Sequence, residues 1–165
     1  MLKYFFGVVA FSLSAIVCHG QSAKSVFFEL GGPGLASFNF DTRFSKREDG
    51  FGGRIGFGGF SIKSDGDNAG VIFIPIGLNY LLGRDNRNYF ELGAGVTPVF
   101  ASDGGDGNFS STFGHLNFGY RLQPQDGGFT FRAFITPVFA SFGFIPYYGG
   151  VSFGYKFGPP KNRTE

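Results

Sequence analysis

The regular succession of apolar stretches is the feature of this sequence that most constrains its fold. After the first twenty residues, eight apolar and aromatic runs follow one another, and polar or glycine-rich breaks separate them. The runs cover residues 25–31, 35–44, 51–62, 70–82, 89–100, 110–122, 128–140 and 147–157. Most are 10 to 13 residues long, which is long for a strand of a soluble protein but suits a tilted strand that spans a membrane.

Several runs alternate between apolar and polar positions, the pattern of a β-strand with one apolar face. In the run 35–44, Phe38 and Phe40 alternate with Asn39 and Asp41. Almost every run also contains an internal glycine or proline, which a helix would resist. The sequence therefore predicts an all-β protein, an antiparallel up-and-down barrel of about eight strands.

The run 70–82 is the exception, because it is apolar at both sets of alternating positions and its orientation stays open.

The uncharged stretch 133–155 is long enough for a transmembrane helix. It contains Pro137 and Pro146 together with four glycines, so two strands joined by a loop near 141–146 explain it better.

The composition favours a membrane-facing surface over a soluble core. The chain has 25 Phe and 29 Gly but no Trp, and aromatic side chains suit a face exposed to acyl chains and headgroups. A disordered Gly/Phe-rich chain is the alternative, which the ordered alternation argues against. The 14 basic and 12 acidic residues nearly balance, so we expect no nucleic-acid partner.

Charged residues inside the runs are few and lie on the face opposite the aromatic residues. They are Glu29, Asp41, Arg43, Arg54, Glu91, Arg121, Arg132 and Lys156. In a membrane barrel this face lines the lumen. With both termini in the periplasm, all eight fall in the periplasmic half of their strands. We predict an ion-pair plug there, an apolar, glycine-lined outer half, and little free diffusion of solutes.

The N-terminus has the pattern of a secretory signal peptide. Met1–Lys3 is short and positive, residues 4–17 are uncharged and apolar, and Gly20 supplies a small residue for cleavage. We expect residues 1–20 to be the signal peptide, 21–157 the barrel and 158–165 a polar tail. A lipid anchor on Cys18 is the competing interpretation, which Val17 before it disfavours.

An internal repeat indicates hairpin units. The segment Thr97–Ser102 recurs as Thr136–Ser141, 39 residues later, and duplication of a two-strand unit gives an even strand number. Pro98 and Pro137 of these copies, together with Pro75, are expected to interrupt their strands in the outward half.

Together these features resemble the small outer-membrane β-barrels of the OmpA/OmpX-like class, particularly the Phe/Gly-rich barrels of Bacteroidetes-type Gram-negative bacteria. The leader, the eight runs, the segment Phe90–Gly95 and the aromatic-ended last strand Gly150–Phe157 carry the resemblance. It implies a porin-like cell-envelope protein in the outer membrane, inserted by the barrel-assembly machinery. We expect a monomer in contact with outer-membrane lipid.

The functional prediction is a non-enzymatic barrel, structural or binding small apolar ligands, lipids or surface partners, without a cofactor, metal or catalytic residue. One alternative is a lipid A-modifying enzyme on the same barrel, in which His115 acts with Ser110 or Ser111. A polar lumen role for His115 is favoured over it. A second alternative is a secreted soluble β-sandwich that buries the Phe-rich face. Asp65, Asp67, Asp103 and Asp106 are interpreted as solvated loop residues and not as Ca²⁺ ligands.

Overall fold

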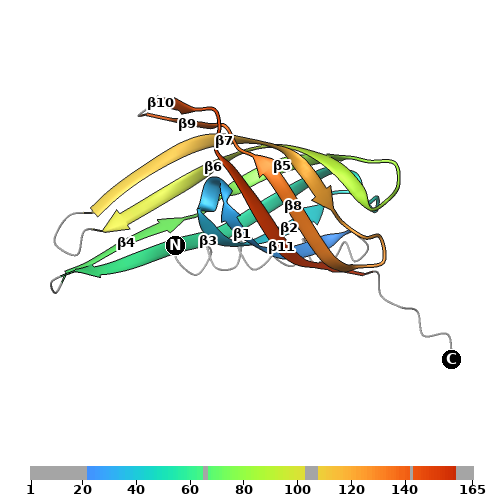
Figure 1. Cartoon of the computed structure of the whole chain (residues 1–165), viewed down its shortest axis with the longest axis horizontal. Helices are drawn as coiled ribbons and strands as arrows, with labels where there is room; N and C mark the ends of the chain where they lie inside the picture. The colour runs from blue at the N-terminus through green and yellow to red at the C-terminus, as the bar shows by residue number, and fades with distance from the viewer. Residues whose placement is uncertain (1–21, 65–66, 103–107, 142, 159–165) are drawn as a thin grey trace, which may run out of the picture.

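The chain folds into a closed, all-β antiparallel barrel of eight strands (Figure 1). This architecture comes from a computed structural model, which describes residues 22–64, 67–102, 108–141 and 143–158. Each strand pairs with its neighbours in sequence, and the last strand pairs with the first from Lys24 opposite Phe157 to Gly31 opposite Gly150. Closure leaves the barrel body without free edges, so the fold is the predicted barrel and not a β-sandwich.

Five barrel strands are continuous and three consist of two segments. The continuous strands are β1 (Lys24–Gly31), β2 (Ala36–Arg43), β3 (Gly50–Ser64), β6 (Asn88–Ser102) and β7 (Asn108–Leu122). The interrupted strands are β4 (Asp67–Phe73) with β5 (Ile76–Leu82), β8 (Gly128–Ile135) with β9 (Val138–Ala140), and β10 (Gly143–Ile145) with β11 (Gly149–Phe157). A 3-10 helix, η1 (Gly32–Gly34), joins β1 to β2. Each predicted run corresponds to one barrel strand, and no helix in the described ranges is long and apolar enough to cross a membrane.

Two of the three prolines in the predicted runs interrupt their strands, and the third does not. Pro75 separates β4 from β5 and Pro137 separates β8 from β9, as expected for a residue without an N–H donor. Pro98 lies inside the unbroken strand β6, opposite Thr112, so the expected interruption there is wrong. Strand β6 pairs with β7 from Asn88 to Ser102, so this ladder continues through Pro98.

The barrel has an apolar outside and a polar inside, the reverse of a soluble protein. Phe38, Phe51 and Phe57 point outward and are 71%, 63% and 59% exposed. At the alternate positions of the same strands, polar side chains point inward and are buried, including Ser37, Asn39, Asp41, Arg43 and Arg54. The pairing also orients the ambiguous run 70–82, in which Phe73, Asn79 and Leu81 are buried and Ile72, Ile76 and Leu78 are exposed.

The two ends of the barrel differ. Short turns at 44–49, 83–87 and 123–127 lie at the end that also holds Lys24 and Phe157; we call this the turn end, and the opposite one the loop end. The hairpins β3–β4 and β6–β7 reach far beyond η1 at the loop end (Figure 1). Strands β3, β6 and β7 have 15 residues each, whereas β1 and β2 have 8.

Candidate functional site

The lumen near the turn end holds a dense group of charged side chains. The structure places all eight charged residues singled out in the sequence inside the barrel, each at most 4% exposed. They are Glu29, Asp41, Arg43, Arg54, Glu91, Arg121, Arg132 and Lys156. They come from seven different strand segments, and their side chains converge on the barrel axis because the inward positions of neighbouring strands are in register.

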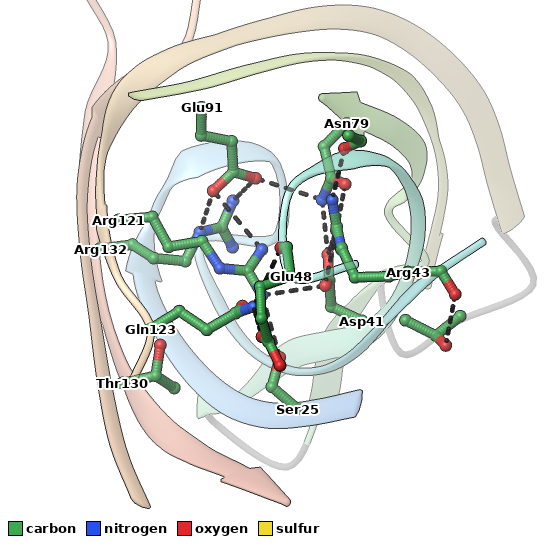
Figure 2. Close-up of polar contacts among 12 residues, drawn as sticks. Ser25, Asp41, Arg43, Glu48, Asn79, Glu91, Arg121, Gln123, Thr130 and Arg132 are labelled. Atoms are coloured by element: carbon green, nitrogen blue, oxygen red, sulfur yellow. Dashed lines mark hydrogen bonds and ion pairs between the residues drawn. The ribbon is translucent and has the colours of Figure 1, made fainter. Parts of the chain in front are cut away.

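Asp41 on β2 is one centre of this group. Its carboxylate accepts hydrogen bonds from Nη2 of Arg43 at 2.8 Å and from Nη2 of Arg121, across the lumen on β7, at 2.9 Å. The amide of Asn79 donates to the other carboxylate oxygen, and Arg43 in turn donates to Asn79 Oδ1. Figure 2 shows these side chains meeting at the centre of the barrel. Two guanidinium groups therefore share one buried carboxylate.

Glu91 and Glu29 bridge the remaining arginines. Arg132 on β8 forms a bidentate pair with Glu91, with Nε–Oε2 at 2.8 Å and Nη2–Oε1 at 2.6 Å. Its Nη1 lies 3.5 Å from Oε2 of Glu29, whose other oxygen accepts from Arg54 at 2.8 Å. Arg121 lies 3.7 Å from Glu91. The planar fork of arginine allows one side chain to contact two carboxylates in this way.

These pairs join into one continuous chain of alternating charge. It runs, in order, through Arg54, Glu29, Arg132, Glu91, Arg121, Asp41 and Arg43. Four arginines alternate with three carboxylates, so every carboxylate lies between two cations. Burial of ions is costly unless they are paired, and this alternation is how the barrel accommodates seven buried charges.

Two aromatic side chains share the lumen with the arginines. Phe27 and Phe134 point inward and are 3% and 8% exposed. The guanidinium carbon of Arg132 lies 4.7 Å from the ring centroid of Phe27 and 5.3 Å from that of Phe134, a cation–π arrangement. The expectation that charges and aromatic residues lie on opposite faces is thus wrong at these positions. The apolar atoms here fill space that ions alone would leave open.

A ninth charged residue, Glu48 in the β2–β3 turn, was missed in the sequence. Its Oε1 lies 2.6 Å from Nζ of Lys156 on β11, and its Oε2 accepts from Gln123 at 3.0 Å. Lys156 also donates to the backbone carbonyls of Pro124 and Gln125, at 3.0 and 2.6 Å. The turn is therefore folded across the barrel mouth and fastened to the far wall. A glutamate in a polar turn carries no sequence signal for this fold-back.

Polar amides complete the network, and their positions in the sequence were informative only in part. Asn39 accepts from Arg54 at 3.1 Å and donates to Ser37. It lies on the polar face of an alternating strand, which the pattern identified. Asn79 donates to Glu91 at 3.2 Å but belongs to the run 70–82, whose alternation could not orient it.

His115 is buried in the lumen away from any serine that could act with it. It is 2% exposed, and its Nδ1 lies 3.3 Å from Oγ1 of Thr97. Ser111 is four residues further along an extended strand, a separation of about 13 Å, and Ser110 points to the other face of β7. The structure therefore does not assemble the His–Ser pair of the enzyme alternative.

Several segments and residues singled out in the sequence lie outside the described part of the chain. The signal peptide, Cys18 and most of the polar tail lie outside the described residues, as do Asp65, Asp103 and Asp106. Within the described part, no group of three or more His, Cys, Asp or Glu side chains is arranged to hold a metal ion.

Comparison with known proteins places the fold. The N-terminal β-barrel domain of Pseudomonas aeruginosa OprF superposes with a TM-score of 0.57 at 13% identity, covering 83% of this chain and 98% of that one. The Neisserial surface protein A, NspA, superposes with a TM-score of 0.53 at 12% identity, covering 83% and 95%. No family model and no curated protein matches the sequence. The chain thus has the fold of the small eight-stranded outer-membrane barrels, as its resemblance to that class predicted.

Proposed function

We propose that this chain is a non-enzymatic outer-membrane barrel whose lumen is sealed by its own ion-pair chain. The continuous row of four arginines and three carboxylates across the lumen carries the proposal. A solute that crosses the barrel would have to separate these buried pairs, and each broken pair leaves an unsatisfied charge at a cost of several kcal/mol.

The outer surface supports the membrane location. Large apolar side chains cover the outward positions around the barrel, and a shallow apolar groove of about 780 Å³ crosses β11, β1, β2 and β3. Such a surface in water would be an aggregation hazard, whereas acyl chains cover it without cost. Tyr80, Tyr120 and Tyr155 lie near the turn end, where tyrosine suits a membrane–water interface.

The proposed topology puts the turn end in the periplasm and the loop end outside the cell. Short periplasmic turns and longer outward hairpins are typical of such barrels. In this arrangement the ion-pair chain and the Glu48–Lys156 contact close the periplasmic half. We propose that the barrel works as a monomer, that its assembly depends on the barrel-assembly machinery, and that membrane lipid is its main partner.

Fractionation and conductance test the proposal in two steps. We expect recovery in the outer membrane and a mobility on unboiled SDS gels that changes on heating. In planar bilayers the wild-type barrel should conduct little, whereas the double variant Glu91→Ala/Arg132→Ala should open small channels because it removes both members of a central pair. The matched control is Arg47→Ala/Asp49→Ala, which removes an exposed pair in a turn. Large, stable wild-type channels would contradict the seal, and recovery as a soluble protein would contradict the location.

A further inference from the structure

The barrel wall is too low on one side to span a membrane. Eight residues in each of β1 and β2, at about 3.3 Å per residue and a tilt of about 40°, give a wall about 20 Å high, below the apolar band of about 25 Å. The same arithmetic gives a height of about 38 Å for the 15 residues of β3, β6 or β7. We call the side formed by β1 and β2 the low wall and the side formed by β3, β4, β6 and β7 the tall wall. With the turn end at the periplasmic face, the low wall ends inside the outer leaflet.

The top of the low wall is folded inward. Gly32, Pro33 and Gly34 of η1 are buried inside the barrel. Gly32 has φ 67°, and a Cβ there would lie 2.9 Å from Oε1 of Glu29 and 2.8 Å from the Phe134 ring, so only glycine fits. The η1 turn thus covers the row of ion pairs at the level of Glu29. It does not extend the barrel wall further toward the loop end.

Above η1 the tall wall presents a mostly apolar inner face. Inward positions here carry Phe60, Val71, Val99, Ala101, Phe109 and Phe113, together with the small polar Ser111, as the pairing of β3, β4, β6 and β7 shows. Phe60 and Phe109 are 52% and 63% exposed on this face, although Phe60 lies 6.4 Å from the buried ring of Phe73. None of the described side chains on this inner face is charged. An uncovered apolar face of this size calls for an apolar occupant.

The low wall leaves this face open toward the membrane. Beyond Gly58, the paired positions of β3 all lie opposite β4, and from Asn108 to Phe113 those of β7 all lie opposite β6, within the described residues. Strand β9 meets β7 only at Gly114 and His115. Within the described residues, no paired strand therefore closes the tall wall above η1, and the rim of this open side carries the exposed side chains of Leu30 and Leu35.

We propose that the inner face of the tall wall binds an acyl chain of a membrane lipid from the outer leaflet, which enters sideways over η1. The inference rests on the proposed membrane location. The occupant follows from the apolar rim, because residues 30–35, which separate the outer surface from the inner face, include no charged residue and expose Leu30 and Leu35. The buried charges beneath η1 form the lower limit of the site, so the acyl chain cannot pass further toward the periplasm.

The absence of Trp from the chain allows a direct test with three matched single-tryptophan variants. Phe113→Trp reports on the inner face above η1, Phe27→Trp on the sealed lumen below it, and Phe57→Trp on the outer surface. Each variant is refolded into phosphatidylcholine vesicles with and without bromine atoms on the acyl chains, and folding is checked by gel mobility. We expect the brominated lipid to quench Phe113→Trp about as strongly as Phe57→Trp, and Phe27→Trp much less.

The outcomes separate this inference from the proposed function. Quenching of Phe57→Trp with Phe113→Trp quenched no more than Phe27→Trp overturns the acyl-chain site and leaves the membrane barrel standing. No quenching of Phe57→Trp overturns both. Quenching of Phe113→Trp by a free brominated fatty acid but not by the phospholipid also overturns entry from the membrane. If Phe113→Trp does not fold, Val99→Trp on the same inner face replaces it.

Discussion

Replacement of Asp41 by asparagine is the sharpest test of the charged lumen. Asp41 is 1% exposed and accepts from Arg43 at 2.8 Å and from Arg121 at 2.9 Å. Asparagine keeps the size of the side chain but removes the charge that both guanidinium groups share. Arg43 then keeps only neutral partners, and Arg121 keeps Glu91 at 3.7 Å.

The expected loss follows from the burial of this site. Removing one partner of a buried ion pair typically costs about 3–5 kcal/mol. With a denaturant slope of about 2 kcal/mol per molar urea, the unfolding midpoint should fall by about 1.5–2.5 M. The double variant Asp41→Asn/Arg43→Gln should recover part of this loss, because it also removes one of the stranded cations.

Urea unfolding of the barrel refolded in lipid vesicles measures these shifts, with the folded fraction read from unboiled gels. The matched control is Asp49→Asn, which removes the partner of the exposed Arg47 in the β2–β3 turn. Solvent screens that pair, so its midpoint should barely move. Equal midpoint shifts for Asp41→Asn and Asp49→Asn would refute the reasoning, because burial would then contribute nothing.

Three further predictions use the same unfolding measurement. Gly154→Ala should lower the midpoint and the refolding yield, because its Cβ would lie 2.2 Å from a β1 carbonyl oxygen at the barrel seam; Gly114→Ala, with the nearest atom at 3.9 Å, should be tolerated. Hydrogen bonds from the Asn88 side chain and nearby backbone N–H groups lower the pKa of Asp85 from 3.8 to about 2. Its contribution to stability is therefore complete above pH 3.8 and lost as the pH falls toward 2, and Asp85→Ala should lose this part of the pH dependence; an unchanged profile would contradict it. Glu48→Gln should destabilise more than Asp49→Asn, since Lys156 then keeps only carbonyl partners.

The sequence by itself determined the strands and their facing. Period-two alternation is a local property of each strand, so the positions of Phe38, Asn39 and Asp41 could be assigned without knowing any neighbour. Where alternation is absent, as in the run 70–82, the facing could not be assigned. Proline chemistry predicted the breaks at Pro75 and Pro137, but the same chemistry failed at Pro98, where the pairing of β6 with β7 continues without a break.

Only the tertiary structure decided which charges meet. Arg121 and Asp41 are 80 residues apart in the chain, and their contact depends on barrel closure and register, which no local pattern encodes. The fold-back of Glu48 across the mouth and the inward turn of η1 depend on the shape of the space they fill. The unequal wall heights follow from strand lengths. They open one side of the wall only because the short and long strands belong to the same barrel, where a short strand makes a low wall beside a tall one.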